Sequence, residues 1–438
     1  MDTSKGGEPR PGVLLAFPSS NQNVRADLRA LERAGLLTLF CTTIALGNSP
    51  LSGILPPTIR HELARRSFEG IPGARIKTFP WREAARLLAT RLGLSGVARH
   101  EIGWASYDSV SQAFDREVAR YIRRGKAPAS AVYAYEYAAL RIFKAAAERG
   151  MRRFYELPIG YWRAGLRIMT EEHERNPEWA PTIDLLKDSP RKQERKDVEI
   201  GSADHIIVPS EFVRGTLREH PSVTATVDVI SYGAPRANPA AVAARGRATR
   251  LRLLYVGHLS QRKGLSYLFD AMRCLKGIAT LTLVGQKPDN ECAALEAELR
   301  QHNWLGTMPH ARVLEVMAQH DVFVFPSLFE GLALVVLEAM AQGLPIITTV
   351  NSGATGAIEE GKEGFVVPIR DSDAIAAWVL ELARDRERLD AMSTAALAKA
   401  ERMSWAAREA AFVATLRRRL QWPGAWNEEH RAEVNPVA

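Results

Sequence analysis

The segment that most constrains the fold of this chain alternates between strand and helix. Residues 321–325 are predicted to form a buried strand that stops at Pro326. Residues 333–342 are predicted to form a helix, and residues 344–350 the next strand. A crossover helix between two strands is the unit of a parallel, doubly wound sheet, so we predict an α/β fold.

The same alternation runs through most of the chain, which has 438 residues and suits two domains of about 200 residues each. Residues 233–250, rich in Pro, Ala and Arg, are predicted to be the interdomain linker. We expect one Rossmann-like domain at residues 1–232 and a second at 251–403. A helix and tail are expected at residues 404–438.

Two carboxylates flank an apolar run in the segment described first. Glu330 lies in the loop after the strand, and Glu338 lies one helical turn after Leu334 on the same helix face. The loop after a parallel strand is where open α/β sheets bind ligands, and the helix N-terminus favours a phosphate there. One acid is therefore placed to meet a sugar and the other a ribose, with diphosphate between them. That pattern indicates a nucleotide-sugar site.

Four motifs, taken together with their spacing along the chain, resemble the retaining glycosyltransferases of family 4, which have the two-domain GT-B fold. The first is Glu-x7-Glu, from Glu330 to Glu338. The second is Leu-Leu-Tyr-Val-Gly-His-Leu-Ser-Gln-Arg-Lys-Gly at residues 253–264. The others are Asn-Ser-Gly-Ala at 351–354 and Glu-Gly-Phe-Val-Val-Pro-Ile-Arg-Asp at 363–371. The resemblance is dense from residue 252 to 373, thinner from 195 to 232, and limited to general layout before residue 150. It implies two domains that face a cleft, with the C-terminal helix crossing back to pack on the N-terminal domain.

The resemblance implies a role for each candidate residue of the donor site. Arg262 and Lys263 would hold the donor diphosphate and act with Glu330, which would position the sugar, as the catalytic set. Glu338 would accept both ribose hydroxyls. The remaining donor contacts implied are Gly257, His258, Gly285, Met308, His310, Leu332, Ala333, Leu334 and Val335.

Each of these residues also has a simpler interpretation. Arg262 and Lys263 fit a pair of surface cations, Glu338 a buried acid paired with an arginine, and Glu330 a cap on the following helix. His258 stands where the family often has Arg, and Ala333 where many relatives have Gly, so the identity of the donor need not follow the family.

The implied activity is transfer of a sugar, with retention and without a metal ion, from a nucleotide-sugar donor to an acceptor hydroxyl. The acceptor is expected to be a glycan, a glycolipid or a small molecule bound by the N-terminal domain. Candidate acceptor contacts are Tyr135, Glu136, Glu156 and Trp162, although core packing is the commoner role for such residues. No Asp-x-Asp motif is found, and no cofactor is expected. The alternatives are a GT-B epimerase or phosphorylase, or a non-catalytic sugar-nucleotide-binding protein.

Charge and composition indicate where such a protein works. The net charge is +8, and several Arg residues fall in residues 81–94, an amphipathic helical pattern. This pattern fits contact with an anionic membrane or a lipid-linked acceptor, but a solvated helix face explains it more simply. No nucleic-acid-binding motif accompanies the charge. Three separated cysteines and the lack of a signal-peptide core or transmembrane run indicate a cytoplasmic protein, with peripheral contact at the inner membrane face as a variant.

Overall fold

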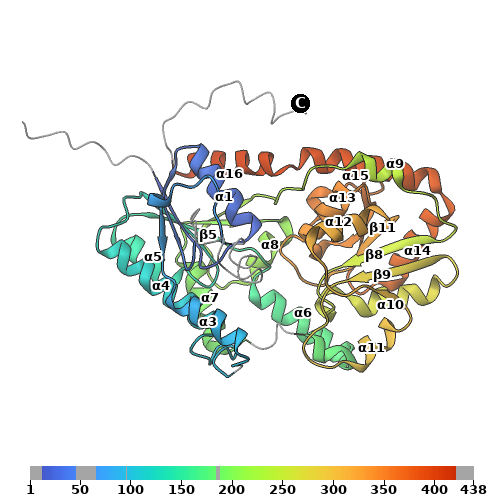
Figure 1. Cartoon of the computed structure of the whole chain (residues 1–438), viewed down its shortest axis with the longest axis horizontal. Helices are drawn as coiled ribbons and strands as arrows, with labels where there is room; N and C mark the ends of the chain where they lie inside the picture. The colour runs from blue at the N-terminus through green and yellow to red at the C-terminus, as the bar shows by residue number, and fades with distance from the viewer. Residues whose placement is uncertain (1–11, 46–65, 95, 184–187, 421–438) are drawn as a thin grey trace, which may run out of the picture.

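The computed structural model describes residues 12–45, 66–94, 96–183 and 188–420. These residues form two parallel α/β sheets that lie side by side, with two successive helices, α15 (Arg386–Arg402) and α16 (Trp405–Leu420), running along one side of them (Figure 1). The first sheet comes from the N-terminal half of the chain and the second from the C-terminal half. The predicted fold class, with two doubly wound sheets, is confirmed.

The N-terminal sheet has seven strands in the order β3-β2-β1-β4-β5-β6-β7, all parallel. The order reverses direction between β1 and β4, which is the point where a doubly wound sheet opens a crevice for a ligand. Its strands are β1 (Val13–Ala16), β2 (Leu37–Thr42), β3 (Ile76–Thr78), β4 (Ala131–Tyr135), β5 (Arg152–Glu156), β6 (His205–Val208) and β7 (Thr226–Val229).

The C-terminal sheet has six parallel strands in the order β10-β9-β8-β11-β12-β13. Its switch in direction lies between β8 and β11. The strands are β8 (Leu251–Val256), β9 (Ala279–Val284), β10 (Asn303–Trp304), β11 (Val322–Phe325), β12 (Ile346–Thr349) and β13 (Gly364–Val367). Most of these strands are apolar and buried, as a sheet covered by helices on both faces requires.

Helices connect the strands of both sheets. Those of the N-terminal half are α1 (Gln22–Arg33), α3 (Trp81–Arg91), α4 (Tyr107–Arg123), α5 (Leu140–Glu148), α6 (Trp162–Arg175), α7 (Pro190–Gly201) and α8 (Glu211–Thr216). Those of the C-terminal half are α9 (Pro239–Ala244), α10 (Leu265–Cys274), α11 (Ala293–Leu299), α12 (His310–Ala318), α13 (Leu334–Ala341), α14 (Ser372–Arg384), α15 (Arg386–Arg402) and α16 (Trp405–Leu420).

The predicted linker is not an open loop, because it contains α9. The chain then passes between the two sheets a second time, at the start of α16. Ala234 pairs with Ser404 there, and the Ala234 N–H donates to the Met403 carbonyl at 2.6 Å. The two passages therefore lie side by side.

Helix α16 packs against α1, so the predicted return of the C-terminal helix to the N-terminal half is confirmed (Figure 1). Phe412 and Leu416 complete the apolar core under α1, whereas Trp405 packs against the other core. A buried ion pair between Arg408 and Asp27 adds to the docking of the helix. The expected tail after Leu420 lies outside the described residues.

One segment of the N-terminal half reaches the C-terminal half. Helix α6 begins at Trp162 and is followed by a 3-10 helix, η3 (Pro177–Thr182). Trp179 of η3 lies in the core of the C-terminal sheet and stacks on Phe269, with ring centroids 5.9 Å apart. Part of the N-terminal half therefore packs on the C-terminal half. The short strand β3 was not predicted.

Candidate active site

The candidate site is built on the loop between β11 and α13. Pro326 ends the strand, and the following loop is held from the end of the next strand. The Thr349 hydroxyl donates to the Ser327 carbonyl at 2.5 Å, and the Asn351 amide donates to the Leu328 carbonyl at 2.8 Å. This bracing fixes the direction in which Glu330 leaves the loop.

Glu330 is buried and receives both predicted cations. The Arg262 guanidinium lies 3.0 Å from Glu330 Oε1, and the Lys263 ammonium forms an ion pair with the same oxygen. The Ser327 hydroxyl also donates to this oxygen, at 3.0 Å. Arg262 further donates to the Phe329 carbonyl at 2.7 Å. The structure thus brings the three predicted catalytic residues together.

The charge balance at Glu330 keeps it ionised. Burial alone would raise the pKa of this carboxyl, but Arg262, Lys263 and the Ser327 hydroxyl together hold the pKa below its ordinary value. Since two cations face one carboxylate, the group of three carries a net positive charge. It therefore suits an anionic ligand.

The two cations reach Glu330 because their own loop docks on the end of β11. They belong to a 3-10 helix, η6 (Gln261–Lys263), which ends at Gly264 in the left-handed conformation, φ 71°. A Cβ atom at Gly264 would lie 2.1 Å from the Pro326 carbonyl oxygen. Only glycine permits both this backbone conformation and this close approach.

A cavity of about 350 Å³ opens beside these residues. The first turn of α13 forms part of its wall, so the positive end of this helix faces the cavity. Glu338 lies on the same wall, and its Oε1 is 2.9 Å from Nε2 of His310 at the start of α12. The predicted residues that line the cavity are Gly257, Lys263, His310, Glu330, Leu332, Ala333, Leu334, Val335 and Glu338.

Four predicted residues do not line this cavity. Arg262 hydrogen-bonds to Glu330, which does line the cavity. Gly285 supports the wall from the neighbouring strand end, where a Cβ atom would lie 1.8 Å from the Gly257 carbonyl oxygen. Met308 packs against the apolar core, and the His258 carbonyl accepts a hydrogen bond from the Tyr255 hydroxyl at 2.8 Å.

Four residues of the site were not predicted from the sequence. Val256, Val313 and Phe325 line the cavity, and buried Ser327 bonds to Glu330. The strand-end position of Val256 and Phe325 was a usable signal, because strand ends at a switch point face the ligand. No pattern marked Val313.

The N-terminal half touches the Glu330 loop directly. The Gly160 N–H donates to the Glu330 carbonyl at 3.1 Å, and the Ser210 hydroxyl donates to the Gly331 carbonyl at 2.6 Å. A Cβ atom at Gly331 would lie only 1.7 Å from the Pro158 carbonyl oxygen. The two halves are therefore closed onto each other at the site.

A second contact between the halves, the Glu172 cluster, consists of Glu172, Asn176, Gln261, Tyr267 and Arg370. The fully buried Glu172 carboxylate of α6 accepts hydrogen bonds from Gln261 at 2.7 Å and from Arg370 at 2.8 Å. Asn176 and Tyr267 also donate to it. Because Gln261 belongs to η6, this cluster ties the cation loop to the N-terminal half.

Three of the four candidate acceptor contacts are engaged within the protein. Tyr135 is buried and donates to Asp27 at 2.5 Å. Glu156 is buried and accepts hydrogen bonds from Tyr133 and Tyr232. The Trp162 indole donates to Asp197 at 2.5 Å. The packing interpretation describes these three residues, whereas the Glu136 side chain makes no such hydrogen bond within the described part of the chain.

In the described residues, no helix combines the length and apolarity needed to cross a membrane.

Comparison with known proteins gives a family match within the C-terminal half. Residues 243–399 match the model for glycosyl transferases group 1. The chain is 30% identical over 164 residues to the amylovoran biosynthesis glycosyltransferase AmsK of Erwinia amylovora, and 31% identical over 168 residues to glycogen synthase of Mycobacterium tuberculosis. These matches span 34% and 37% of this chain, and only 40% and 41% of the two relatives.

Solved structures resemble the whole fold. Sucrose-phosphate synthase from Thermosynechococcus elongatus superposes with a TM-score of 0.66 at 16% identity, covering 94% of this chain and 99% of that one. Anabaena HepE, solved with UDP and glucose, gives a TM-score of 0.60 at 17% identity, covering 93% and 99%. Residues 243–399 therefore match the group 1 glycosyltransferases, and the chain as a whole has the GT-B fold.

Proposed function

We propose that this chain is a retaining glycosyltransferase that needs no metal ion and transfers a sugar from a nucleotide-diphosphate-sugar donor to an acceptor hydroxyl. The observation that carries the proposal is the meeting of Arg262, Lys263 and Glu330 at the wall of a cavity that also exposes Glu338 and a helix N-terminus. Glu330 would meet the sugar of the donor, the two cations and the helix N-terminus its diphosphate, and Glu338 its ribose.

The diphosphate would bind Arg262, Lys263 and the N–H groups at the start of α13. When the diphosphate binds, Arg262 and Lys263 turn from Glu330 to the phosphate oxygens. The Glu330 carboxylate then accepts hydrogen bonds from hydroxyl groups of the donor sugar. When the bond between the sugar and diphosphate breaks, charge develops on the leaving oxygen. The two cations and the helix stabilise that charge, which is the role of a divalent ion in other transferases.

The nucleoside would lie toward α12. The Glu338 carboxylate would accept hydrogen bonds from the two ribose hydroxyls. His310, which contacts Glu338, lies at the edge of this subsite. The base would then meet the backbone near Met308. HepE is solved with UDP and glucose, which supports a UDP-sugar as the donor.

The acceptor would enter from the N-terminal half, where the loops at Gly160 and Ser210 meet the Glu330 loop. A new bond forms between the acceptor oxygen and the anomeric carbon, the bond from that carbon to the diphosphate breaks, and the acceptor proton leaves with the diphosphate. Closure of the two halves excludes water during this step. AmsK serves amylovoran biosynthesis, which supports a polysaccharide or lipid-linked saccharide as acceptor.

Calorimetric titration of UDP, GDP, ADP and their sugars, with and without EDTA, tests the donor site. We expect one nucleotide to bind with EDTA present, and binding to be lost in Glu338→Ala and Lys263→Ala. Lys362→Ala is the matched control, since Lys362 is exposed and pairs with Glu359 away from the cavity. Binding of none of the nucleotides would refute the donor assignment.

Product analysis separates the enzymatic alternatives. A transferase yields free nucleoside diphosphate and a glycosylated acceptor, an epimerase an isomeric nucleotide-sugar, and a binding protein neither product.

We also propose that the protein contacts the anionic inner face of a membrane through α3. Trp81 at the start of this helix is 85% exposed, and Leu88 and Leu92 are exposed too, beside the cations Arg82 and Arg91. Exposed apolar side chains among cations fit an anionic lipid surface. Vesicle flotation should therefore show binding that rises with the anionic lipid fraction and falls with salt and in Trp81→Ser. Binding that ignores lipid charge would refute the proposal.

A further inference from the structure

The N-terminal half contains a larger cavity, of about 640 Å³. Its wall is built from the loop at residues 101–104, the starts of α4, α5 and α7, and Tyr137 after β4. No residue of the proposed donor site lines it. We refer to it as the α4–α7 cavity.

Topology places the α4–α7 cavity at the edge of the sheet that faces the donor site. Helices that connect parallel strands run against them, so α4, α5 and α7 begin at the carboxyl edge of the sheet. Ser210, just after β6, contacts the Glu330 loop at this same edge. Tyr137 follows β4, which is two strands from β6 in this sheet, so the cavity and the Ser210 contact lie on the same edge.

Two guanidinium groups on the cavity wall have no carboxylate partner among the described residues, and a third has only a long ion pair. Arg82 donates to the Trp104 carbonyl at 2.9 Å and to the Ser109 hydroxyl, both uncharged. Arg141 has its nearest carboxylate oxygen, on Asp115, only at 3.5 Å. Arg191 is exposed and forms no ion pair within the described chain.

The other two cations of the wall are paired with carboxylates, several of which lie behind the wall. Lys192 pairs with Asp188 at 2.6 Å and with Asp108 at 3.1 Å. Arg195 pairs with Glu199 at 3.0 Å, as well as with Asp115. Glu194 is an acid of the wall that is exposed and remains unpaired within the described chain. Of the charged side chains that line the cavity itself, five are basic and three are acidic, so the surface that a ligand meets is more basic than acidic.

Apolar groups accompany this charge. Trp104 is 58% exposed, and the Arg82 guanidinium lies 5.0 Å from its ring centroid. Ile102, beside it, is 77% exposed. An exposed aromatic ring next to a cation suits a sugar, because the ring packs on the apolar face of the sugar while the cation binds its anionic group.

Backbone strain is concentrated at the same cavity. Glu101 has φ 56° and Tyr137 has φ 82°, and among the described non-glycine residues only Arg370 also has a positive φ. Such conformations cost free energy and persist where the surroundings enforce them, often at ligand sites. Glu199 accepts from the Tyr137 N–H at 2.9 Å, and Glu101 accepts from the Ser189 N–H at 2.9 Å. Buried and paired groups thus hold the strained wall in place.

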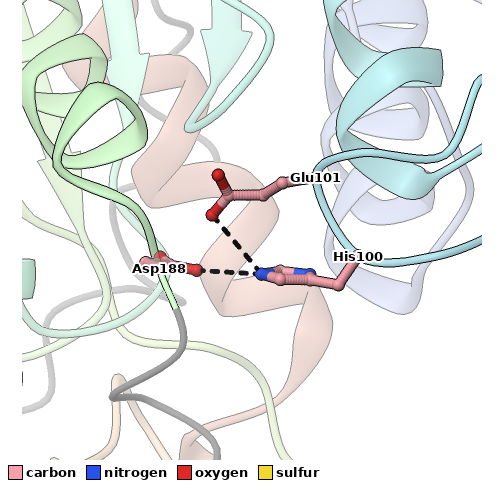
Figure 2. Close-up of side chains that lie close together, drawn as sticks. All are labelled: His100, Glu101 and Asp188. Atoms are coloured by element: carbon pink, nitrogen blue, oxygen red, sulfur yellow. Dashed lines mark ion pairs between the residues drawn. The ribbon is translucent and has the colours of Figure 1, made fainter.

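His100, Glu101 and Asp188 form a cluster at one end of this wall. Figure 2 shows the Glu101 and Asp188 carboxylates pointing toward the His100 ring, and each lies 3.5 Å from His100 Nε2. These groups have the spacing of metal ligands. However, the Lys192 ammonium already lies 2.6 Å from Asp188, so a cation is present without a metal. The cluster joins the loop at residues 99–104 to the start of α7 and braces the cavity.

We infer that the α4–α7 cavity binds an anionic saccharide, a sugar that carries a carboxylate or phosphate group, and that this saccharide is the acceptor. The second part rests on the proposed function. Arg82, Arg141 and Arg191 bind the anionic group, and Trp104 packs on the sugar ring. Because the cavity lies at the carboxyl edge of the sheet, the bound saccharide extends along this edge toward the Glu330 loop.

Calorimetric titration with glucuronic acid, glucose 6-phosphate, glucose and inorganic phosphate tests the inference without any donor. We expect the two anionic sugars to bind at least about tenfold more tightly than glucose or phosphate, since each charge-assisted hydrogen bond and the ring contact add to affinity. Arg82→Gln and Arg191→Gln should each weaken binding about tenfold. Arg116→Gln, an exposed arginine of α4 outside the cavity wall, is the matched control and should bind as the wild type does.

Failure of this inference is distinguishable from failure of the proposed function. Nucleotide binding without binding of any anionic sugar overturns the inference and leaves the donor site intact. Equal affinity for inorganic phosphate and glucose 6-phosphate overturns the saccharide part, because the site would then recognise charge alone. Binding of an anionic sugar that persists in Lys263→Ala supports a site separate from the donor cavity, even if no nucleotide binds.

Discussion

Replacing Glu172 by Gln tests whether the Glu172 cluster holds the two halves of the molecule together. Glutamine keeps the size of the side chain but removes its charge and turns one acceptor oxygen into a donor. The carboxylate is fully buried and accepts from Arg370 at 2.8 Å and from Gln261 at 2.7 Å. The substitution therefore leaves the Arg370 guanidinium without its buried counter-charge.

The expected loss is large for a single substitution. Removing one partner of a buried ion pair costs about 3–5 kcal/mol of unfolding free energy. Because the glutamine side chain would retain one acceptor oxygen, we expect the lower end, about 3 kcal/mol. Glu171, the preceding residue, pairs with the same Arg370 at 2.9 Å but is 41% exposed. Glu171→Gln is thus the matched control, with an expected loss below about 1 kcal/mol.

Denaturant unfolding followed by tryptophan fluorescence measures both variants, and Trp179 lies on the adjoining turn as a local reporter. Nucleotide affinity is measured alongside, because Gln261 precedes the two cations of the donor site. We expect Glu172→Gln to weaken nucleotide binding as well as stability. Equal, small losses in the two variants would refute the reasoning, since the buried cluster would then contribute no more than a surface pair.

Three further predictions concern closure, pH and the crossing helix. Gly331→Ala places a Cβ atom 1.7 Å from the Pro158 carbonyl oxygen. The rate of sugar transfer should therefore fall at least tenfold, while the nucleotide affinity stays unchanged. The control Gly356→Ala, which has open space around the new Cβ atom, should transfer sugar at the wild-type rate. Burial raises the pKa of Glu156 to about 7, so the folded state holds a proton that the unfolded state releases between about pH 4.5 and 7, and stability falls as pH rises through that window. The unfolding free energy should therefore fall between pH 5 and pH 8, and this fall should be about 2–3 kcal/mol smaller in Glu156→Gln than in the wild type. An equal fall in the two proteins would contradict this assignment. Arg408→Met leaves a buried carboxylate unpaired and should cost about 3–5 kcal/mol in denaturant unfolding; a loss below about 1 kcal/mol would show that the pair is not desolvated.

The donor side was predictable from sequence because its residues are local. Glu330 and Glu338 follow one strand and lie on one helix, so the spacing along the chain determines the spacing in space. Arg262 and Lys263 are 68 and 67 residues from Glu330, yet each group sits at a strand end beside the same switch point, which the alternation of strands and helices reveals. The family resemblance added the roles, and those roles stay predictions until a ligand is bound.

The contacts between the halves were not predictable, because no local pattern links their members. Glu172 and Arg370 are 198 residues apart, and nothing in either segment indicates the other. The apolar residues of α3 also illustrate the limit. Their helical spacing indicates an apolar face but not what covers it, and Leu88 and Leu92 are exposed. The α4–α7 cavity likewise combines residues from several separate segments.

The return of α16 to the N-terminal half affects the order in which the chain can fold during synthesis. Phe412 and Leu416 belong to the core under α1, yet the last strand of that sheet ends at Val229. About 175 residues separate the sheet from the helix that completes its core, and a ribosome needs roughly 10–35 s to make them. Until then the N-terminal sheet exposes an apolar groove and an uncompensated Asp27, so this half should depend on chaperones when the chain is nascent, and should aggregate when expressed as a fragment that stops at the linker.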